Sequence, residues 1–158
     1  MINKIFSCYL LCILFTPLNS YAFGLTKMSF EDRISNSTHI FIGEVTNIVS
    51  KTEYKWVLQY AEIDLVTLIK GSKITQPIKL ILKRGISEQN LLCCRNEKGI
   101  KYLILATEID SFMYAVHPRD SVFELNSEQV KNWAFGKNNQ LKVVVNQILA
   151  TAKNLSAK

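Results

Sequence analysis

Cysteine is scarce in this chain, and its scarcity excludes one class of secreted protein. Two of the four cysteines, Cys8 and Cys12, lie in an apolar N-terminal stretch that we expect to be removed, which leaves Cys93 and Cys94. Two cysteines cannot form the disulfide framework of a small stapled domain. The stability of the fold must therefore come mainly from an apolar core, for which the chain has ample isoleucine, leucine, valine and phenylalanine.

Long apolar runs are lacking beyond the N-terminus. The run at residues 5–15 is too short for a membrane-spanning helix, which needs about 20 residues. Lys4 precedes this run, and Ser20-Tyr21-Ala22 fits a small-x-small cleavage site. We therefore predict a signal peptide over residues 1–22 and a secreted or periplasmic protein with no membrane span after cleavage. An uncleaved N-terminal anchor is the alternative.

Concentrated positive charge and catalytic motifs are lacking as well. The net charge is +6, but the basic residues are scattered and no cluster exceeds Lys83-Arg84. Nucleic-acid binding usually shows a concentrated basic patch, so we do not expect a nucleic-acid partner. The chain has no Gly-x-Ser-x-Gly elbow and no glycine-rich phosphate loop. Glu62 and Asp64 share a strand face, which is typical of the solvent side of a strand. We predict a protein that is not an enzyme and needs no cofactor.

What the sequence does contain is a series of short strand-like runs. They lie at residues 39–49, 54–69, 78–82, 101–107 and 112–116. Residues 101–107 are almost entirely apolar, so we expect both of their faces to be covered, and we expect residues 112–116 to close a hairpin with them. Gly43 interrupts the first run, which indicates a bulge or sharp bend. Residues 51–53 are polar and are expected to form a turn.

Helical patterns lie at the two ends of the chain. Ser29 is followed three residues later by Asp32, which predicts a short capped helix with Phe30 and Ile34 on one side. Residues 127–133 resemble the start of another helix, with Ser127 as its cap.

Apolar residues at helical spacing predict a C-terminal helix at residues 138–152. Strands without alternating helices predict a mainly β fold, namely a small five-stranded OB-like Greek-key barrel with a short N-terminal helix and a C-terminal helix. We assign residues 23–158 to one such domain, with residues 127–158 as its helical C-terminal extension. A β-sandwich is the alternative architecture.

Three motifs together resemble a known family. Residues 40–45 read IFIGEV, residues 69–71 read IKG at the end of the second strand, and Cys94 shortly precedes the GIKYL run at residues 99–103. In this order they resemble the bacterial secreted relatives of the tissue inhibitor of metalloproteinases, in the netrin-like OB-fold group. The resemblance covers roughly residues 28–126 and implies a barrel of the OB type. It also makes a divergent metalloproteinase inhibitor an alternative function.

The chain departs from that family in two ways. Inhibitors of the family block a catalytic zinc with the amine and carbonyl of an N-terminal cysteine, whereas the expected mature N-terminus here is Phe23. The resemblance therefore does not carry inhibition to this chain. Bacterial relatives often have a second cysteine after the last hairpin, where residues 114–118 here contain none. The bridge of those relatives cannot form, and the extra cysteine lies beside the first one.

Cys93 and Cys94 are candidates for a redox or metal function. Adjacent Cα atoms are about 3.8 Å apart, below the usual disulfide range of about 4.4–6.8 Å, so a vicinal disulfide would be strained and easily reduced. The plainer interpretation is one buried thiol and one that is free or bridges two chains. A metal would need both cysteines to converge with His39 and His117, which lack ligand spacing. We expect no metal site and a surface position for His39.

An aromatic and basic pattern marks the second strand-like run. Tyr54, Trp56 and Tyr60 alternate there with Lys55 and Gln59. OB folds bind oligonucleotides or sugars through exposed aromatic and basic faces, so these three aromatic residues are candidates for a binding surface. The alternative is that Trp56 and Tyr60 pack beneath the C-terminal helix. We predict a binding or interaction module whose partner is another protein, with a redox or metal protein centred on the two adjacent cysteines as an alternative.

Overall fold

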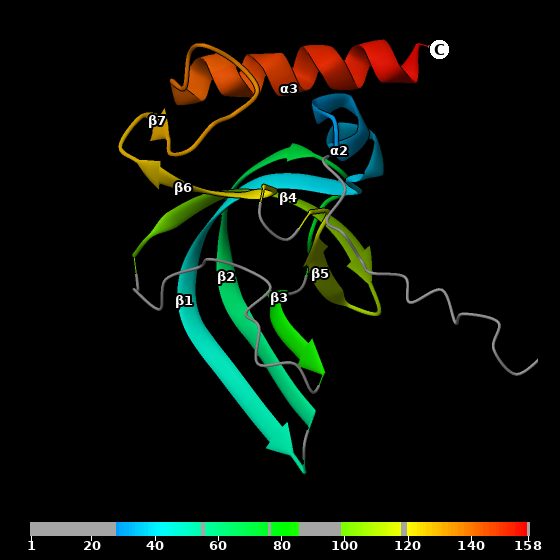
Figure 1. The fold of residues 1–158 in the computed structure, drawn as a ribbon, viewed down its shortest axis with the longest axis vertical. Helices are drawn as coiled ribbons and strands as arrows, with labels where there is room; N and C mark the ends of the chain where they lie inside the picture. Colours follow the sequence, from blue (N-terminus) through cyan, green and yellow to red (C-terminus); the bar gives the residue numbers. More distant parts are fainter. Residues whose placement is uncertain (1–27, 55, 76, 86–98, 118–119, 158) are drawn as a thin grey trace, which may run out of the picture.

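The computed structural model describes residues 28–54, 56–75, 77–85, 99–117 and 120–157. It is mainly β, with 52% of these described residues in strands (Figure 1). The elements in chain order are α2 (Phe30–Asn36), β1 (His39–Glu53), β2 (Trp56–Lys70), β3 (Ile78–Gly85), β4 (Lys101–Ile109), β5 (Phe112–Ala115), β6 (Val122–Asn126), β7 (Gln129–Val130) and α3 (Leu141–Ser156).

Five of the strands form a ring. The order is β1-β2-β3-β5-β4, and an additional pairing between β1 and β4 closes it. All neighbours in the ring are antiparallel except β3 and β5, which are parallel and share the single register pair Leu80 and Met113. The predicted mainly β, barrel-like architecture with a helix near each end is therefore confirmed.

Gly43 lies where β1 pairs with two neighbouring strands, β2 and β4. The first part of β1 pairs with β4, whereas its whole length pairs with β2, and the β1–β2 register shifts between Ile42 and Gly43. A Cβ on Gly43 would lie 2.2 Å from Ile63 Cγ2, so a side chain would separate the two strands. The prediction of a bulge or bend at this glycine is confirmed as a shift in strand register.

The apolar side chains form two cores on opposite faces of β4. One lies inside the ring: Phe41, Val45, Ala61, Ile63, Ile78, Leu80, Leu82, Tyr102, Ile104, Ala106 and Met113. The other lies between the sheet and the two helices: Phe30, Ile34, Ile40, Ile42, Leu103, Leu105, Phe123, Val130, Trp133, Val144 and Ile148. Strand β4 contributes alternate residues to both clusters, which confirms that both of its faces are covered.

Both terminal helices confirm their sequence patterns. Ser29 Oγ accepts a hydrogen bond from the backbone N–H of Asp32 at 3.1 Å, as the cap pattern predicts. Helix α3 begins a few residues later than expected and extends to Ser156, and its own Val144 and Ile148 are buried.

The helix expected at residues 127–133 is wrong. Residues 122–126 and 129–130 form β6 and β7, which pair antiparallel through a tight turn in which Ser127 has a φ of 54°. The turn directs Val130 into the core beneath α3, where it is fully buried. Burial of this side chain outweighs the local cap pattern, and the sheet has seven strands where five were expected.

The turn expected at residues 51–53 is also wrong, because β1 continues to Glu53. Glu53 pairs with Trp56, and Tyr54 adopts a φ of 53° in the turn between the strands. Strands β1, β2 and β3 extend together beyond the ring, and the end of the β1–β2 hairpin lies opposite the helices along the long axis of the molecule (Figure 1).

Candidate functional site

The end of the β1–β2 hairpin carries two exposed aromatic side chains. Tyr54 is 98% exposed and Trp56 is 59% exposed. A Cβ on Gly85 of β3 would lie 3.9 Å from Trp56 Cζ3, so the indole lies beside the backbone of the neighbouring strand. Most side chains of this size are buried on folding, so two exposed ones at one end of the molecule mark a candidate contact surface.

Charged residues lie beside Trp56. A shallow pocket of about 210 Å³ beside the indole is lined by Lys51, Glu53, Trp56, Val57, Leu58 and Arg84. Arg84 Nη1 donates a hydrogen bond to Tyr114 Oη at 2.6 Å, which fixes the guanidinium. We define Lys51, Glu53, Tyr54, Trp56 and Arg84 as the hairpin tip. Tryptophan, tyrosine and arginine are the residues that most often dominate protein interfaces.

Tyr60 does not belong to this surface. Its side chain is only 7% exposed, and its ring packs edge-on against Phe112 with centroids 5.8 Å apart. The β2–β3 register shifts between Gln59 and Tyr60, and this irregularity interrupts the alternation on which the prediction of one aromatic face depended. The prediction of a surface formed by three aromatic residues is therefore wrong for Tyr60. Tyr54 and Trp56 are exposed, as that prediction requires.

The alternative position beneath the C-terminal helix is wrong for Trp56, which lies at the hairpin tip. Other aromatic residues fill the space beneath α3. Phe30, Phe123 and Phe135 all contact Trp133, with ring centroids between 5.1 and 5.6 Å away.

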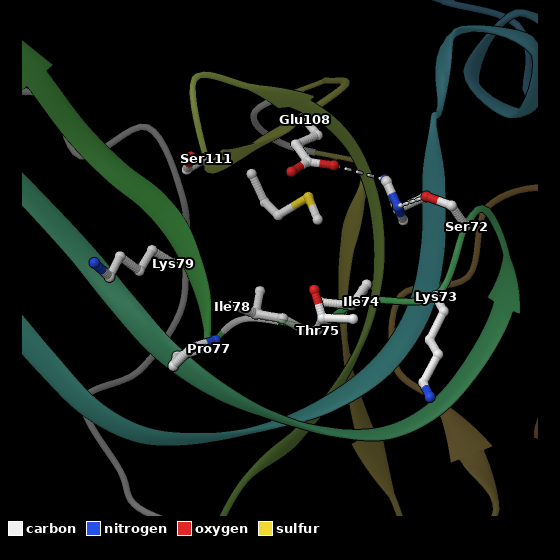
Figure 2. Close-up of a pocket in the computed structure, with 11 residues that line it drawn as sticks. Ser72, Lys73, Ile74, Thr75, Pro77, Ile78, Lys79, Glu108 and Ser111 are labelled. Atoms are coloured by element: carbon white, nitrogen blue, oxygen red, sulfur yellow. Dashed lines mark hydrogen bonds and ion pairs between the residues drawn. The ribbon is translucent and has the colours of Figure 1, made fainter.

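A second candidate site lies at one end of the ring, where β3 and β5 both begin (Figure 2). We call it the ring-end pocket. Its volume is about 250 Å³, and its lining comprises His39, Ser72, Lys73, Ile74, Thr75, Pro77, Ile78, Lys79, Glu108, Ser111 and Met113. Ile78 and Met113 also belong to the core inside the ring, so the floor of the pocket is the end of that core.

His39 forms one wall of the ring-end pocket and is buried, so the surface position expected for it is wrong. Its Nδ1 lies 3.0 Å from Thr38 Oγ1 and its Nε2 lies 3.3 Å from Ser72 Oγ. Gly71, with a φ of +115°, allows the loop after β2 to cover the ring, because a Cβ there would lie 2.6 Å from His39 Cδ2. The imidazole is therefore held in one orientation.

Ser72 and Glu108 lie on the two sides of the His39 ring, as the serine and the acid do in a catalytic triad, but the distances are not those of a triad. Glu108 Oε2 lies 3.9 Å from His39 Nδ1, which is beyond hydrogen-bond distance. Thr38 Oγ1 occupies the position beside Nδ1 that the acid takes in a triad, and it also accepts a hydrogen bond from the backbone N–H of Glu108. The arrangement orients polar groups around a pocket and does not couple the acid to the imidazole.

Of the remaining candidates for metal or redox chemistry, the structure describes His117, which lines neither the ring-end pocket nor the pocket at the hairpin tip. His117 is buried and its Nδ1 lies 3.4 Å from Asp120 Oδ2. Cys93 and Cys94 lie outside the described residues, as does Phe23. Within the part of the chain that the structure describes, no three histidine, cysteine, aspartate or glutamate side chains are grouped so that they could hold a metal ion.

Sequence patterns could have located part of the ring-end pocket. Thr38-His39 at the start of one strand and Gly71-Ser72 at the end of the next are polar pairs beside apolar runs. Antiparallel pairing of these strands brings the two pairs together. Glu108 carries no comparable signal, because its position depends on the length of β4.

Within the described ranges, no helix combines the length and apolar character needed to cross a membrane. Comparison of the chain with protein-family models and with curated protein sequences finds no match.

Proposed function

We propose that this protein is a non-catalytic binding module that acts outside the cytoplasm and engages another protein through the hairpin tip. The observation that carries the proposal is the exposure of Tyr54 and Trp56, at 98% and 59%, on a projecting hairpin. Aromatic side chains bury about 150–250 Å² each, at about 25 cal/mol per Å². Covering both on association can therefore contribute several kcal/mol.

The hairpin tip also has the rigidity that favours tight binding. Strand β2 pairs with β1 on one side and with β3 on the other, up to Trp56 and Val57 at its first residues. A surface held in its bound conformation loses less conformational entropy when it binds. The signal-peptide pattern at residues 1–22 supports action outside the cytoplasm.

The proposal is tested by using the mature protein as bait in an envelope and extracellular fraction of its own source. We expect a specific protein to be captured, and the Y54A/W56A double variant to capture at least tenfold less. Leu149→Ala is the matched control, because Leu149 is also an exposed apolar side chain, at 46%, but lies on α3. Equal capture by the double variant and the control would reject the hairpin tip, and the absence of any specific partner would reject the module.

A further inference from the structure

We propose that the ring-end pocket binds a small zwitterion of the free amino-acid type, with an apolar side chain on the pocket floor. The site is independent of the hairpin tip. It exists because β3 and β5 share only the pair Leu80 and Met113, so the two strands leave space between the loop that precedes β3 and the turn that precedes β5.

The size and floor of the pocket favour a small, partly apolar ligand. Its volume of about 250 Å³ is below the about 300–1,000 Å³ that is usual for drug-sized ligands. Ile74, Ile78 and Met113 supply apolar surface that is continuous with the core of the ring. A branched aliphatic side chain would displace water from this surface.

Glu108 supplies the negative charge of the site. Its nearest charged or titratable neighbour is His39, with Oε2 and Nδ1 separated by 3.9 Å, and among the described residues no side chain donates a hydrogen bond to this carboxylate. In Figure 2 the carboxylate of Glu108 and the hydroxyl of Thr75 face the same space. An ammonium group placed there would donate charge-assisted hydrogen bonds to Glu108.

Two lysines supply positive charge at the rim. The side chains of Lys73 and Lys79 line the pocket, and in Figure 2 both ammonium groups extend away from its centre. Lys79 Nζ lies 5.9 Å from the ring centroids of Tyr60 and Phe112, beside two rings that do not line the pocket. A ligand with an ammonium group alone would be repelled by these cations, whereas a zwitterion directs its carboxylate toward them.

His39 positions the wall and does not bind the ligand charge. Both of its ring nitrogens already contact hydroxyl groups, on Thr38 and Ser72. The imidazole therefore provides a fixed polar wall beside Glu108.

The experiment compares three probes with the same apolar side chain by NMR titration of the mature protein: leucine, leucinamide and N-acetyl-leucine. Leucinamide has the ammonium group alone, as at a peptide N-terminus, and N-acetyl-leucine has the carboxylate alone, as at a peptide C-terminus. We expect leucine to bind with a Kd on the order of 1 mM and to shift the signals of Met113 and His39. Each of the other probes should bind at least about fivefold more weakly.

Matched variants assign the charges. Glu108→Gln should weaken leucine binding about tenfold and leave N-acetyl-leucine unaffected. The K73Q/K79Q double variant should weaken leucine binding severalfold. Asp64→Asn is the control, because Asp64 is an exposed carboxylate on β2 outside the pocket. The proposal is overturned if leucine shifts no pocket signal at 20 mM, on the order of twenty times that expected Kd, if leucinamide binds as tightly as leucine, or if Glu108→Gln binds leucine as the unmodified protein does.

Discussion

Arg33 Nη2 lies 3.2 Å from Asp120 Oδ2, so helix α2 is joined directly to the connection between β5 and β6. The guanidinium is almost fully buried. Its Nε and Nη2 also donate to Met28 O, and it lies 4.6 Å from the centroid of Phe135. One side chain thus holds together three segments that are distant in sequence.

Removing the carboxylate should destabilise the protein because Arg33 would keep a buried charge without its partner. We expect Asp120→Ala to lower the free energy of unfolding by about 2–4 kcal/mol, measured by urea denaturation. Asp64→Asn, a change of an exposed carboxylate elsewhere, should change it by less than about 0.5 kcal/mol. A loss in Asp120→Ala no larger than in this control would contradict the role assigned to the pair.

Lys70 stabilises the other end of α2. Its Nζ donates to the backbone oxygens of Ile34 and Ser37 at 2.6 and 2.7 Å, and these are carbonyls that the helix leaves without internal partners. We expect Lys70→Met to cost about 1–3 kcal/mol at neutral pH. Lys153→Met, at an exposed position on α3, serves as the control.

The contribution of Lys70 to the free energy of unfolding should depend on pH. Burial lowers the pKa of Lys70 below its usual 10.5. Between the lowered folded-state value and 10.5 the unfolded chain binds more protons than the folded chain, so the contribution of Lys70 to stability rises with pH. The difference in unfolding free energy between the unmodified protein and Lys70→Met should therefore grow as the pH approaches 10.5. If the difference becomes smaller over that interval, the pKa of Lys70 is not lowered in the folded protein, and the predicted direction is wrong.

Gly71 should not tolerate a side chain. A Cβ there would lie 2.7 Å from Thr38 O and 2.6 Å from His39 Cδ2, at a φ of +115°. We expect Gly71→Ala to cost about 2–4 kcal/mol in thermal or urea unfolding. At Gly136, which has no positive φ, the nearest atom is a glutamine side-chain oxygen at 3.3 Å, and Gly136→Ala should cost less than about 1 kcal/mol. Equal losses would contradict the fit of the loop against His39.

The two tryptophans should differ in fluorescence. Trp56 is exposed, whereas Trp133 is buried among Phe30, Phe123 and Phe135. The Trp133→Phe variant should emit at longer wavelength and be quenched more strongly by acrylamide than Trp56→Phe. Quenching that is equally weak in both variants would place the indole of Trp56 in the interior and remove it from the hairpin tip.

Sequence patterns predicted those parts of the fold in which contacts with residues distant in sequence favour the same structure as the local residues do. The cap formed by Ser29 and the bend at Gly43 are confirmed because each follows from a property of one residue and its near neighbours. Ser127 shows the opposite case. Its cap pattern is satisfactory in isolation, but pairing with β6 and the burial of Val130 decide the structure.

The candidate sites were only partly predictable for the same reason. Tyr54 and Trp56 were identified by the alternation of aromatic and polar residues along the strand, but their separation from Tyr60 depends on a register shift between β2 and β3. His39 was expected at the surface because it stands at the start of a strand. Ser72 and Glu108, 33 and 69 residues away, lie beside it, and the residues next to His39 in sequence do not show either contact.

Site-specific photo-cross-linking at Tyr54 tests the central proposal most directly. A photoreactive phenylalanine derivative at position 54 keeps an aromatic side chain at the most exposed point of the hairpin tip, and the same group at position 149 on α3 is the control. We predict one discrete cross-linked protein from position 54 and none from position 149, with the adduct lost in a Trp56→Ala background. Cross-linking that is absent at position 54, or equal at the two positions, would contradict the proposal that the hairpin tip binds a protein partner.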